Sequence, residues 1–172
     1  MLDAYERMAG SPLLVLVPRH PQRFDEIAAL LERRGLRYER RSAGRGAAPA
    51  TQVLLGDSMG EMPAYYAACD VAFIGGSLLP YGGHNFIEAC ALGAPVLLGP
   101  HTYNFAQATE QALAGGAACR VADASGLAST AQALLQDTDR RALMAARALE
   151  FSRTHQGATG RIMVLLEPLL TD

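Results

Sequence analysis

Short, uninterrupted apolar runs that alternate with helical stretches constrain the fold of this chain more than any other feature. Because polar residues do not interrupt the runs, they are typical of strands covered on both faces in a parallel sheet. The runs predicted as strands are LLVLV (13–17), QVLL (52–55), VAFI (71–74), PVLL (95–98) and CRVA (119–122). Their alternation with helices predicts an α/β fold, a doubly wound, Rossmann-like parallel sheet with flanking helices. We expect residues 1–172 to form a single domain around one core.

The helix boundaries follow from the Pro, Gly and capping residues between these runs. Pro21 opens a helix that Gly35 closes, and residues 36–41 are a candidate for one more strand. The Gly- and Pro-rich residues 42–50 predict a loop, the most mobile segment of the chain. Further helices are predicted over 61–68, 85–92 and 104–114, over two stretches capped by Ser125 and by Asp137 or Asp139, and over 161–170.

Composition and charge exclude several classes of protein. With 50% apolar residues, 19% charged residues and a net charge of −2, the 172-residue chain matches neither a disordered protein nor a dedicated nucleic-acid binder. No apolar run approaches the ~18–20 residues of a membrane span, and residues 1–10 lack the apolar core of a secretion signal. All 15 basic residues are Arg, which excludes a P-loop or Schiff-base lysine. Widely spaced Cys69, Cys90 and Cys119 predict reduced, buried thiols.

Polar residues gather directly after the predicted strands. Arg19 and His20 follow the first run, His84 lies in a Gly-rich segment after the third, and His101 follows the fourth. In an open α/β sheet the carboxyl ends of parallel strands meet at one edge, where ligands bind. Although turns are polar in any protein, three histidines and an arginine at one edge favour a binding site there.

The segment Gly82-Gly83-His84-Asn85 at this edge is predicted to open a helix, whose free N–H groups would suit a phosphate. Asn85 is equally suited to be an N-cap. Glu88 lies one turn later and is placed either for sugar hydroxyls or for a capping box, and the spacing favours neither. Arg19 is suited either to a forked contact with a phosphate or to a surface ion pair with an acid of the following helix.

Two further groups of side chains leave alternatives open. The three histidines and Asp57 are residue types that bind metals, but without a tight i,i+4 pair we favour hydrogen-bonding roles for them. An Arg-rich run is interpreted as a solvated face, and a docking patch for an anionic membrane surface is the less favoured alternative. The run consists of Arg33, Arg34, Arg37, Arg40, Arg41 and Arg45.

Taken together, the segments after the strands resemble one known family. They are PRHPQRFDEIAALLERRG (18–35), LLGDSMGEMPAYYAACDVAFIGGSL (54–78), GGHNFIEACALGAPVLLGPHTYNF (82–105) and AGGAACRV (114–121). Over roughly residues 11–170 the chain resembles the C-terminal half of bacterial 3-deoxy-D-manno-octulosonic acid (Kdo) transferases. The GGHN-x-x-E and GPHT-x-NF segments are the most specific. Cys90, where Pro or Ala is expected, and Met62, where Leu is common, are small departures.

The resemblance implies a GT-B glycosyltransferase that transfers Kdo from CMP-Kdo to a lipid A precursor with inversion, in lipopolysaccharide biosynthesis. It implies that the acceptor domain, the catalytic base and a membrane anchor belong to an N-terminal half absent here. The chain alone is therefore expected to be soluble and inactive, and the full-length protein to act at the cytoplasmic face of the bacterial inner membrane. The expected partners are CMP-Kdo and, through the missing half, the lipid A precursor, with no nucleic acid, no cofactor and no metal.

The family motifs also assign site residues, none of them catalytic. Contacts to CMP-Kdo are expected from Pro18, Arg19, Met59, Gly60, Glu61, Asn85, Phe86, Ile87 and Glu88. Further candidates without an assigned role are His20, Gly83, His84 and His101. In this scheme 59–61 lies against cytosine and ribose, and 85–88 holds the phosphate at its helix start and the ribose hydroxyls through Glu88. The alternatives are a donor domain of another nucleotide-sugar transferase or epimerase, and a non-catalytic Rossmann-like module.

Overall fold

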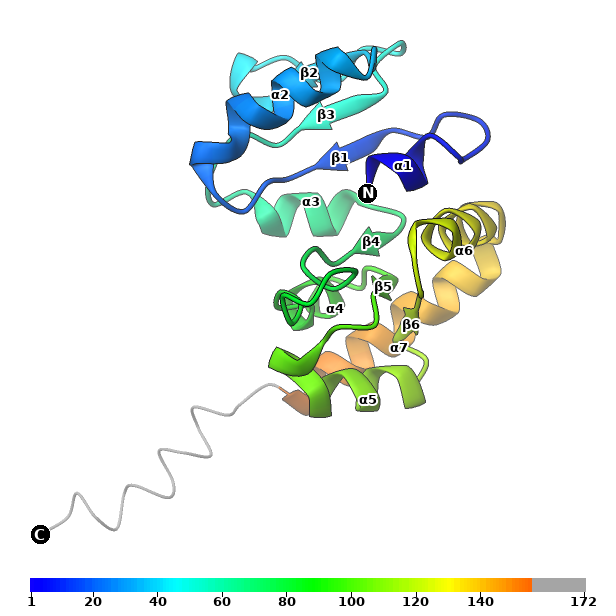
Figure 1. Ribbon diagram of the computed structural model, residues 1–172. Helices are drawn as coiled ribbons and strands as arrows, with labels where there is room; N and C mark the ends of the chain where they lie inside the picture. Colours follow the sequence, from blue (N-terminus) through cyan, green and yellow to red (C-terminus); the bar gives the residue numbers. More distant parts are fainter. Residues whose placement is uncertain (156–172) are drawn as a thin grey trace, which may run out of the picture.

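The fold consists of two three-stranded parallel sheets flanked by helices (Figure 1). The computed structural model describes residues 1–155, so the helix predicted over 161–170 lies outside the described residues. The strands are β1 (Leu14–Leu16), β2 (Tyr38–Arg40), β3 (Val53–Leu55), β4 (Ala72–Phe73), β5 (Val96–Leu98) and β6 (Ala118–Arg120). The first sheet has the order β1-β3-β2 and the second the order β4-β5-β6.

Short 3-10 turns lead into or separate several of the helices. The α-helices are α1 (Leu2–Tyr5), α2 (Phe24–Arg33), α3 (Met62–Ala68), α4 (Ile87–Ala91), α5 (Ala106–Ala114), α6 (Ala124–Gln136) and α7 (Thr138–His155). The 3-10 turns are η1 (Pro21–Arg23), η2 (Arg41–Ala43) and η3 (Tyr103–Phe105). No helix within residues 1–155 is both long enough and apolar enough to cross a membrane.

The predicted α/β class with parallel strands and flanking helices is confirmed, including the candidate strand over 36–41. The hydrogen-bonded strands nevertheless divide into two sheets instead of forming one. Strand β4 has only two residues, and among the described residues its ladder partner is β5, not β1. The helix predicted over 85–92 is also shorter than expected, since α4 begins at Ile87.

Two caps and one turn determine where the helices begin and end. Gly35 has a φ of +66°, which favours glycine, and it ends the helical segment as predicted. The N-cap of α6 is Asp123, whose Oδ1 accepts from the Gly126 N–H at 2.8 Å, so the predicted cap at Ser125 is wrong. Asp137 was one of two predicted caps for α7, and its Oδ1 accepts from the Arg140 N–H at 2.9 Å.

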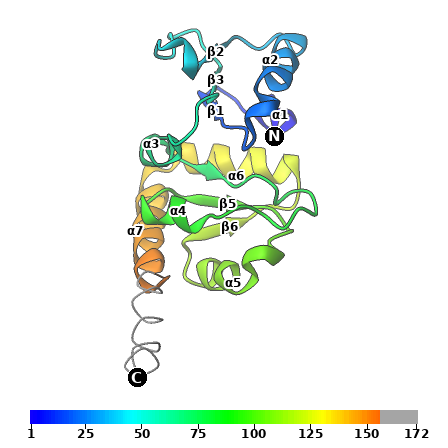
Figure 2. The ribbon, with the colours of Figure 1, turned by 90° about the vertical axis from the view of Figure 1, so that its left-hand side faces the viewer.

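Successive side chains along β5 point to opposite faces of the second sheet, and both faces are packed. Val96 and Leu98 join a cluster with side chains of α4, α5 and α7, whereas Leu97 joins another with side chains of α6. All three are completely buried. Figure 2 shows α6 along one side of β5 and β6 and α5 along the other. A run of consecutive apolar residues is therefore what this strand requires.

The first sheet has a smaller core, shared with helix α1. Leu31 of α2 packs with Val53 and Leu55 of β3, and Leu2 and Tyr5 of α1 join the same cluster. Ala4 of α1 packs instead with the α6 side of the second sheet. Helix α1 thus ties the two sheets together through apolar contacts.

Candidate functional site

One hydrogen bond joins the loop after β1 to the loop after β4. Arg19 Nη1 lies 2.9 Å from His84 Nδ1, and the ring of His84 packs against the backbone of Gly75 and Gly76. Burial, together with the positive charges of Arg19 and His20, lowers the pKa of His84. These contacts bring Arg19, His20 and His84 together as predicted for this edge. Arg19 does not form the alternative ion pair with an acid of α2 within the described residues.

The backbone of the Gly-rich segment is already engaged. The Gly83 N–H donates to the Gly76 carbonyl at 2.9 Å, and the His84 N–H donates to the Gly75 carbonyl at 3.2 Å. The expectation that these two N–H groups are free for a phosphate is therefore wrong. The physical reason is that residues 82–85 pair with the preceding loop instead of starting the helix, whose N-cap is Phe86.

Asn85 and Glu88 form a linked pair at the start of α4. The Asn85 side chain accepts from the Ile87 N–H at 3.1 Å and donates through Nδ2 to Glu88 Oε1 at 2.8 Å. Glu88 therefore bonds to a side-chain amide and not to the backbone N–H that a capping box requires. Within the described residues Glu88 Oε2 has no hydrogen-bond donor, so this exposed oxygen remains available to a ligand.

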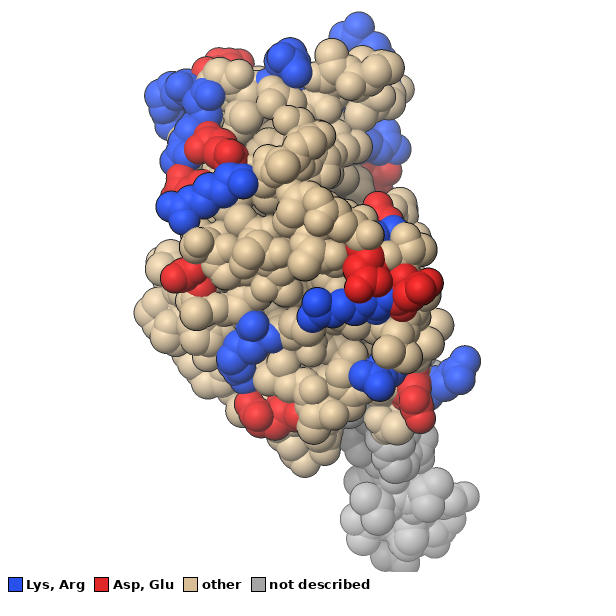
Figure 3. Space-filling view, turned by 90° about the vertical axis from the view of Figure 1, so that its right-hand side faces the viewer, with Lys and Arg blue, Asp and Glu red and all other residues tan. Residues whose placement is uncertain are grey.

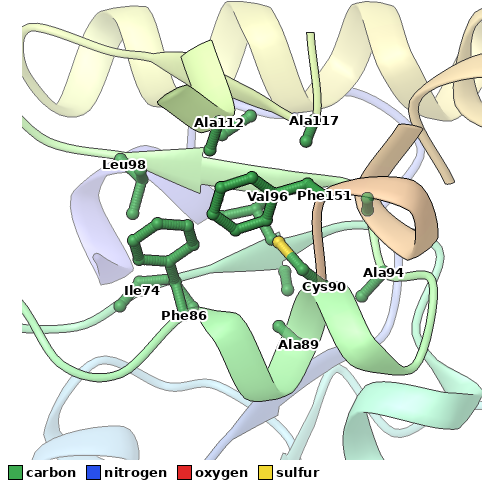
Figure 4. Close-up of a cluster of buried hydrophobic side chains, with 13 residues drawn as sticks. Ile74, Phe86, Ala89, Cys90, Ala94, Val96, Leu98, Ala112, Ala117 and Phe151 are labelled. Atoms are coloured by element: carbon green, nitrogen blue, oxygen red, sulfur yellow. The ribbon is translucent and has the colours of Figure 1, made fainter. Parts of the chain in front are cut away.

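The other two candidates in this turn point elsewhere. Phe86 is 1% exposed and stacks on Phe151 in the core, with ring centroids 5.8 Å apart (Figure 4). It also lies edge-on to Phe105, with ring centroids 6.2 Å apart. Ile87 packs partly buried against the same cluster. Phe86 therefore stays a binding candidate only through its backbone, while its side chain stabilises the helix that carries Glu88.

The loop after β3 presents Glu61 on a polar scaffold. Ser58 Oγ donates to Glu61 Oε2, and Arg41 Nη2 donates to Glu61 Oε1 at 2.7 Å. The hydrogen bond from Ser58 lowers the pKa of Glu61, and Arg41 acts in the same direction. Gly60 has a φ of +80°, and Met59 before it is 66% exposed, so this side chain is available to stack on a ligand.

Comparison with known proteins identifies relatives of this chain. No family model matches the chain. The crystal structure of the C-terminal CMP-Kdo binding domain of WaaA from Acinetobacter baumannii matches with a TM-score of 0.79 and 35% identity, over 83% of this chain and 75% of that one. The 3-deoxy-D-manno-octulosonic acid transferase of Bordetella pertussis is 51% identical over 98% of this chain, and that of Haemophilus influenzae 39% identical over 92%.

The chain belongs to the Kdo transferase family. The resemblance noted from the motifs is thereby confirmed. The chain spans about two fifths of the length of these two transferases, 40% and 37%. Its structural match places it with the C-terminal domain of the family.

One departure from the family motifs has a structural explanation. Cys90 is fully buried beside Phe86 and Phe151, and burial raises the pKa of its thiol to about 12. It is therefore a packing residue in the core of this Kdo transferase domain. The cysteines of the described residues are free, as predicted, but only Cys90 is buried, and the predicted burial is wrong for the half-buried Cys69 and Cys119.

Two residues that hold the site were not assigned to it from the sequence. Arg41 was interpreted as part of a solvated face, yet it binds Glu61. Asp57, a possible metal ligand by residue type, instead accepts with its nearly buried carboxylate from the Ser42 N–H at 2.8 Å and the Ser42 hydroxyl at 2.7 Å. Burial raises the pKa of Asp57, but the bonds from Ser42 and the charge of Arg40 outweigh it, and the net pKa is lowered.

Within residues 1–155 no group of three or more His, Cys, Asp or Glu side chains is arranged to hold a metal ion. His101 is half-buried, and its backbone N–H donates to the Ser77 carbonyl at 2.9 Å. Four members of the Arg-rich run, Arg34, Arg37, Arg40 and Arg41, bond to carboxylates or to a backbone carbonyl. Figure 3 shows blue and red side chains mixed over one face of the molecule.

A cavity of about 660 Å³ lies away from the candidate residues. Residues of α5, of its C-cap and of the last turns of α7 line it, namely Gln107, Ala108, Gln111, Gly115, Glu150, Phe151 and Thr154. Pro18, half-buried at the end of β1, and the other candidates do not line it. The candidate residues thus lie at the edge formed by the loops, outside this pocket.

Proposed function

We propose that this chain is the donor-binding part of a glycosyltransferase and that it binds CMP-Kdo at the edge formed by the loops after β1, β3 and β4. The observation that carries the proposal is the likeness to a CMP-Kdo binding domain, combined with Arg19 and Glu88 at that edge. Arg19 supplies a fixed positive charge for the phosphate. Glu88 Oε2 supplies an acceptor for ribose hydroxyls, and the loop 59–61 covers the base.

In the proposed reaction an acceptor hydroxyl attacks the anomeric carbon of Kdo, and the bond to the CMP oxygen breaks with inversion. Negative charge develops on the departing phosphate, and Arg19 stabilises it electrostatically. The proton leaves the acceptor hydroxyl for a general base outside this chain. The acceptor is a lipid A precursor, and the complete enzyme works at the cytoplasmic face of the inner membrane.

Calorimetry of the 172-residue chain with CMP, UDP and GDP tests the proposed donor. We expect CMP to bind and UDP and GDP to bind more weakly or not at all. Arg19→Ala and Glu88→Ala should each weaken CMP binding about tenfold, since each removes a charge-assisted contact. Arg33→Ala, an exposed arginine on α2, is the matched control and should leave binding unchanged. A preference for UDP, or unchanged CMP affinity in both site variants, contradicts the proposal.

The proposed location of the general base outside these residues predicts a second result. The chain alone should bind CMP and transfer no Kdo to a lipid A precursor. Measurable transfer by the 172 residues would refute the assignment of the base to another domain.

A further inference from the structure

The contact between Arg19 and His84 fixes the state of the histidine ring. A guanidinium carries only donors, so at 2.9 Å from Arg19 Nη1 the Nδ1 of His84 must be the acceptor. The ring is then neutral and carries its proton on Nε2. We infer that His84 is a positioning residue whose neutral ring accepts a hydrogen bond from Arg19 and aims the guanidinium at the nucleotide phosphate. The inference rests on the proposed function.

The ring of His84 is itself held in place. A Cβ at Gly76 would lie 3.4 Å from two ring atoms, and a Cβ at Gly75 would lie 3.5 Å from a third, so the ring packs directly on this backbone. The N–H groups of Gly83 and His84 bond to the carbonyls of the same two glycines. The backbone and the ring of His84 are thus both held by Gly75 and Gly76, and a residue that orients another must itself be held in this way.

A neutral partner leaves the charge of Arg19 uncompensated. Within residues 1–155 no carboxylate forms an ion pair with Arg19, and the two acids in the first turn of the following helix pair with other arginines, Glu26 with Arg23 and Asp25 with Arg40. A carboxylate in the place of His84 would orient Arg19 equally well but would cancel its charge. A histidine acceptor orients the guanidinium and preserves its attraction for an anion.

The surroundings keep the ring neutral near pH 7. The charged groups that act on it are Arg19 and His20 from the loop after β1, and both oppose its protonation. Gly75 and Gly76 on the other side carry no charge, and Glu88 on its own side is bonded to Asn85. Burial adds to the lowering of the His84 pKa. Protonation at low pH would place an N–H opposite the guanidinium and break the contact.

Binding of cytidine 5′-(methyl phosphate) to the 172-residue chain tests this role, because the charge of this diester is constant over the range used. Near pH 8, His84→Ala should weaken binding about tenfold. His84→Asn, whose side-chain oxygen can take the position of Nδ1, should retain most of the affinity. Between about pH 8 and pH 5.5 the unaltered chain should lose affinity, whereas His84→Asn should not.

A double-mutant cycle with Arg19→Ala separates positioning from direct contact. If His84 acts through Arg19, His84→Ala should have no further effect once Arg19 is removed. Full additivity, or an unchanged affinity in His84→Ala, overturns the inference while CMP binding stands. If the unaltered chain fails to bind the diester, the proposed function fails and the inference fails with it.

Nitrogen NMR of the His84 ring gives a readout that needs neither ligand nor variant. We expect the Nε2–H tautomer, with Nδ1 unprotonated, near pH 7. An Nδ1–H tautomer or a charged ring at that pH overturns the inference.

Thermal unfolding of each variant shows whether a loss of affinity reflects a loss of fold.

Discussion

The two sheets present their functional loops by different means. In the second sheet β5 is fully buried, and packed side chains on both faces hold the loops. In the first sheet only the central strand β3 has fully buried residues, Val53 and Leu55, whereas β1 and β2 are half-buried. Polar contacts support its loops, such as Arg41 with Glu61 and Asp57 with Ser42. The candidate site draws on both, since Arg19 comes from the first sheet and His84 and Glu88 come after β4 of the second.

The difference indicates which side chains of the candidate site keep their positions as pH and salt change, and which do not. Groups fixed by apolar packing keep their places over a wide range of pH and salt. Groups fixed by ion pairs and hydrogen bonds respond to both. The proposed donor site would thus combine a wall fixed by apolar packing with a wall held by polar contacts.

A matched pair of leucine truncations tests the comparison with the largest expected effect. Leu97→Ala on β5 should lower the free energy of unfolding by about 3–4 kcal/mol, because the side chain is completely buried. Leu16→Ala on the half-buried β1 should lower it by only about 1–2 kcal/mol. Urea unfolding measures both, and equal losses would remove the distinction between the sheets.

Two glycine substitutions probe the same contrast in the loops. A Cβ on Gly99, after β5, would lie 2.2 Å from the Ser77 carbonyl oxygen, so Gly99→Ala should cost about 2–3 kcal/mol. Gly46, beyond η2, has no heavy atom within 4 Å of a built Cβ, and Gly46→Ala should leave stability unchanged or slightly raised. Thermal unfolding compares them. A Gly99→Ala variant as stable as the unaltered chain would contradict the tight packing of that loop.

Asp57 tests the polar support of the first sheet. Asp57→Asn should cost about 2 kcal/mol near pH 7, because it weakens the bonds that hold Ser42. Since the folded pKa of Asp57 is lowered, its contribution is full above the unfolded value of 3.8 and is lost as the pH falls through the folded value. The variant should therefore show a weaker loss of stability in acid. Asp25→Asn, an exposed acid, is the control and should change stability by less than about 0.5 kcal/mol.

The smallest expected effect concerns Arg41. Arg41→Ala should weaken CMP binding about threefold, because Glu61 loses the partner that orients one of its oxygens. Urea unfolding should change by less than about 1 kcal/mol, since the pair is only partly buried. A CMP affinity equal to that of Arg33→Ala would remove Arg41 from the site.

The sequence predicts most of the fold because its strands and helices differ in apolar periodicity. The consecutive apolar residues 96–98 mark a strand buried on both faces, and Gly35 marks a helix end. The division into two sheets is not predictable, because it depends on which strands form hydrogen bonds across β1 and β4. The cap at Asp123 was missed since Ser125 satisfies the same local rule two residues later.

For the site, sequence motifs locate the segments but not the contacts between them. The proximity of Arg19 and His84, 65 residues apart, arises from the arrangement of two sheets. Likewise, the N–H groups of the Gly-rich segment are occupied through pairing with a loop whose conformation no spacing rule specifies. The role of Arg41 is not predictable from the sequence, because its partner Glu61 lies 20 residues away and only the fold brings the two side chains together.

The most direct test of the account is an NMR titration of the nitrogen-labelled chain with CMP. The account predicts that the amide signals of Arg19, Gly60 and Glu88 shift together and saturate at one affinity. The signals of the cavity between α5 and α7, such as those of Ala108 and Gly115, should stay in place. Shifts confined to that cavity, with none in the loops after β1, β3 and β4, would contradict the central claim.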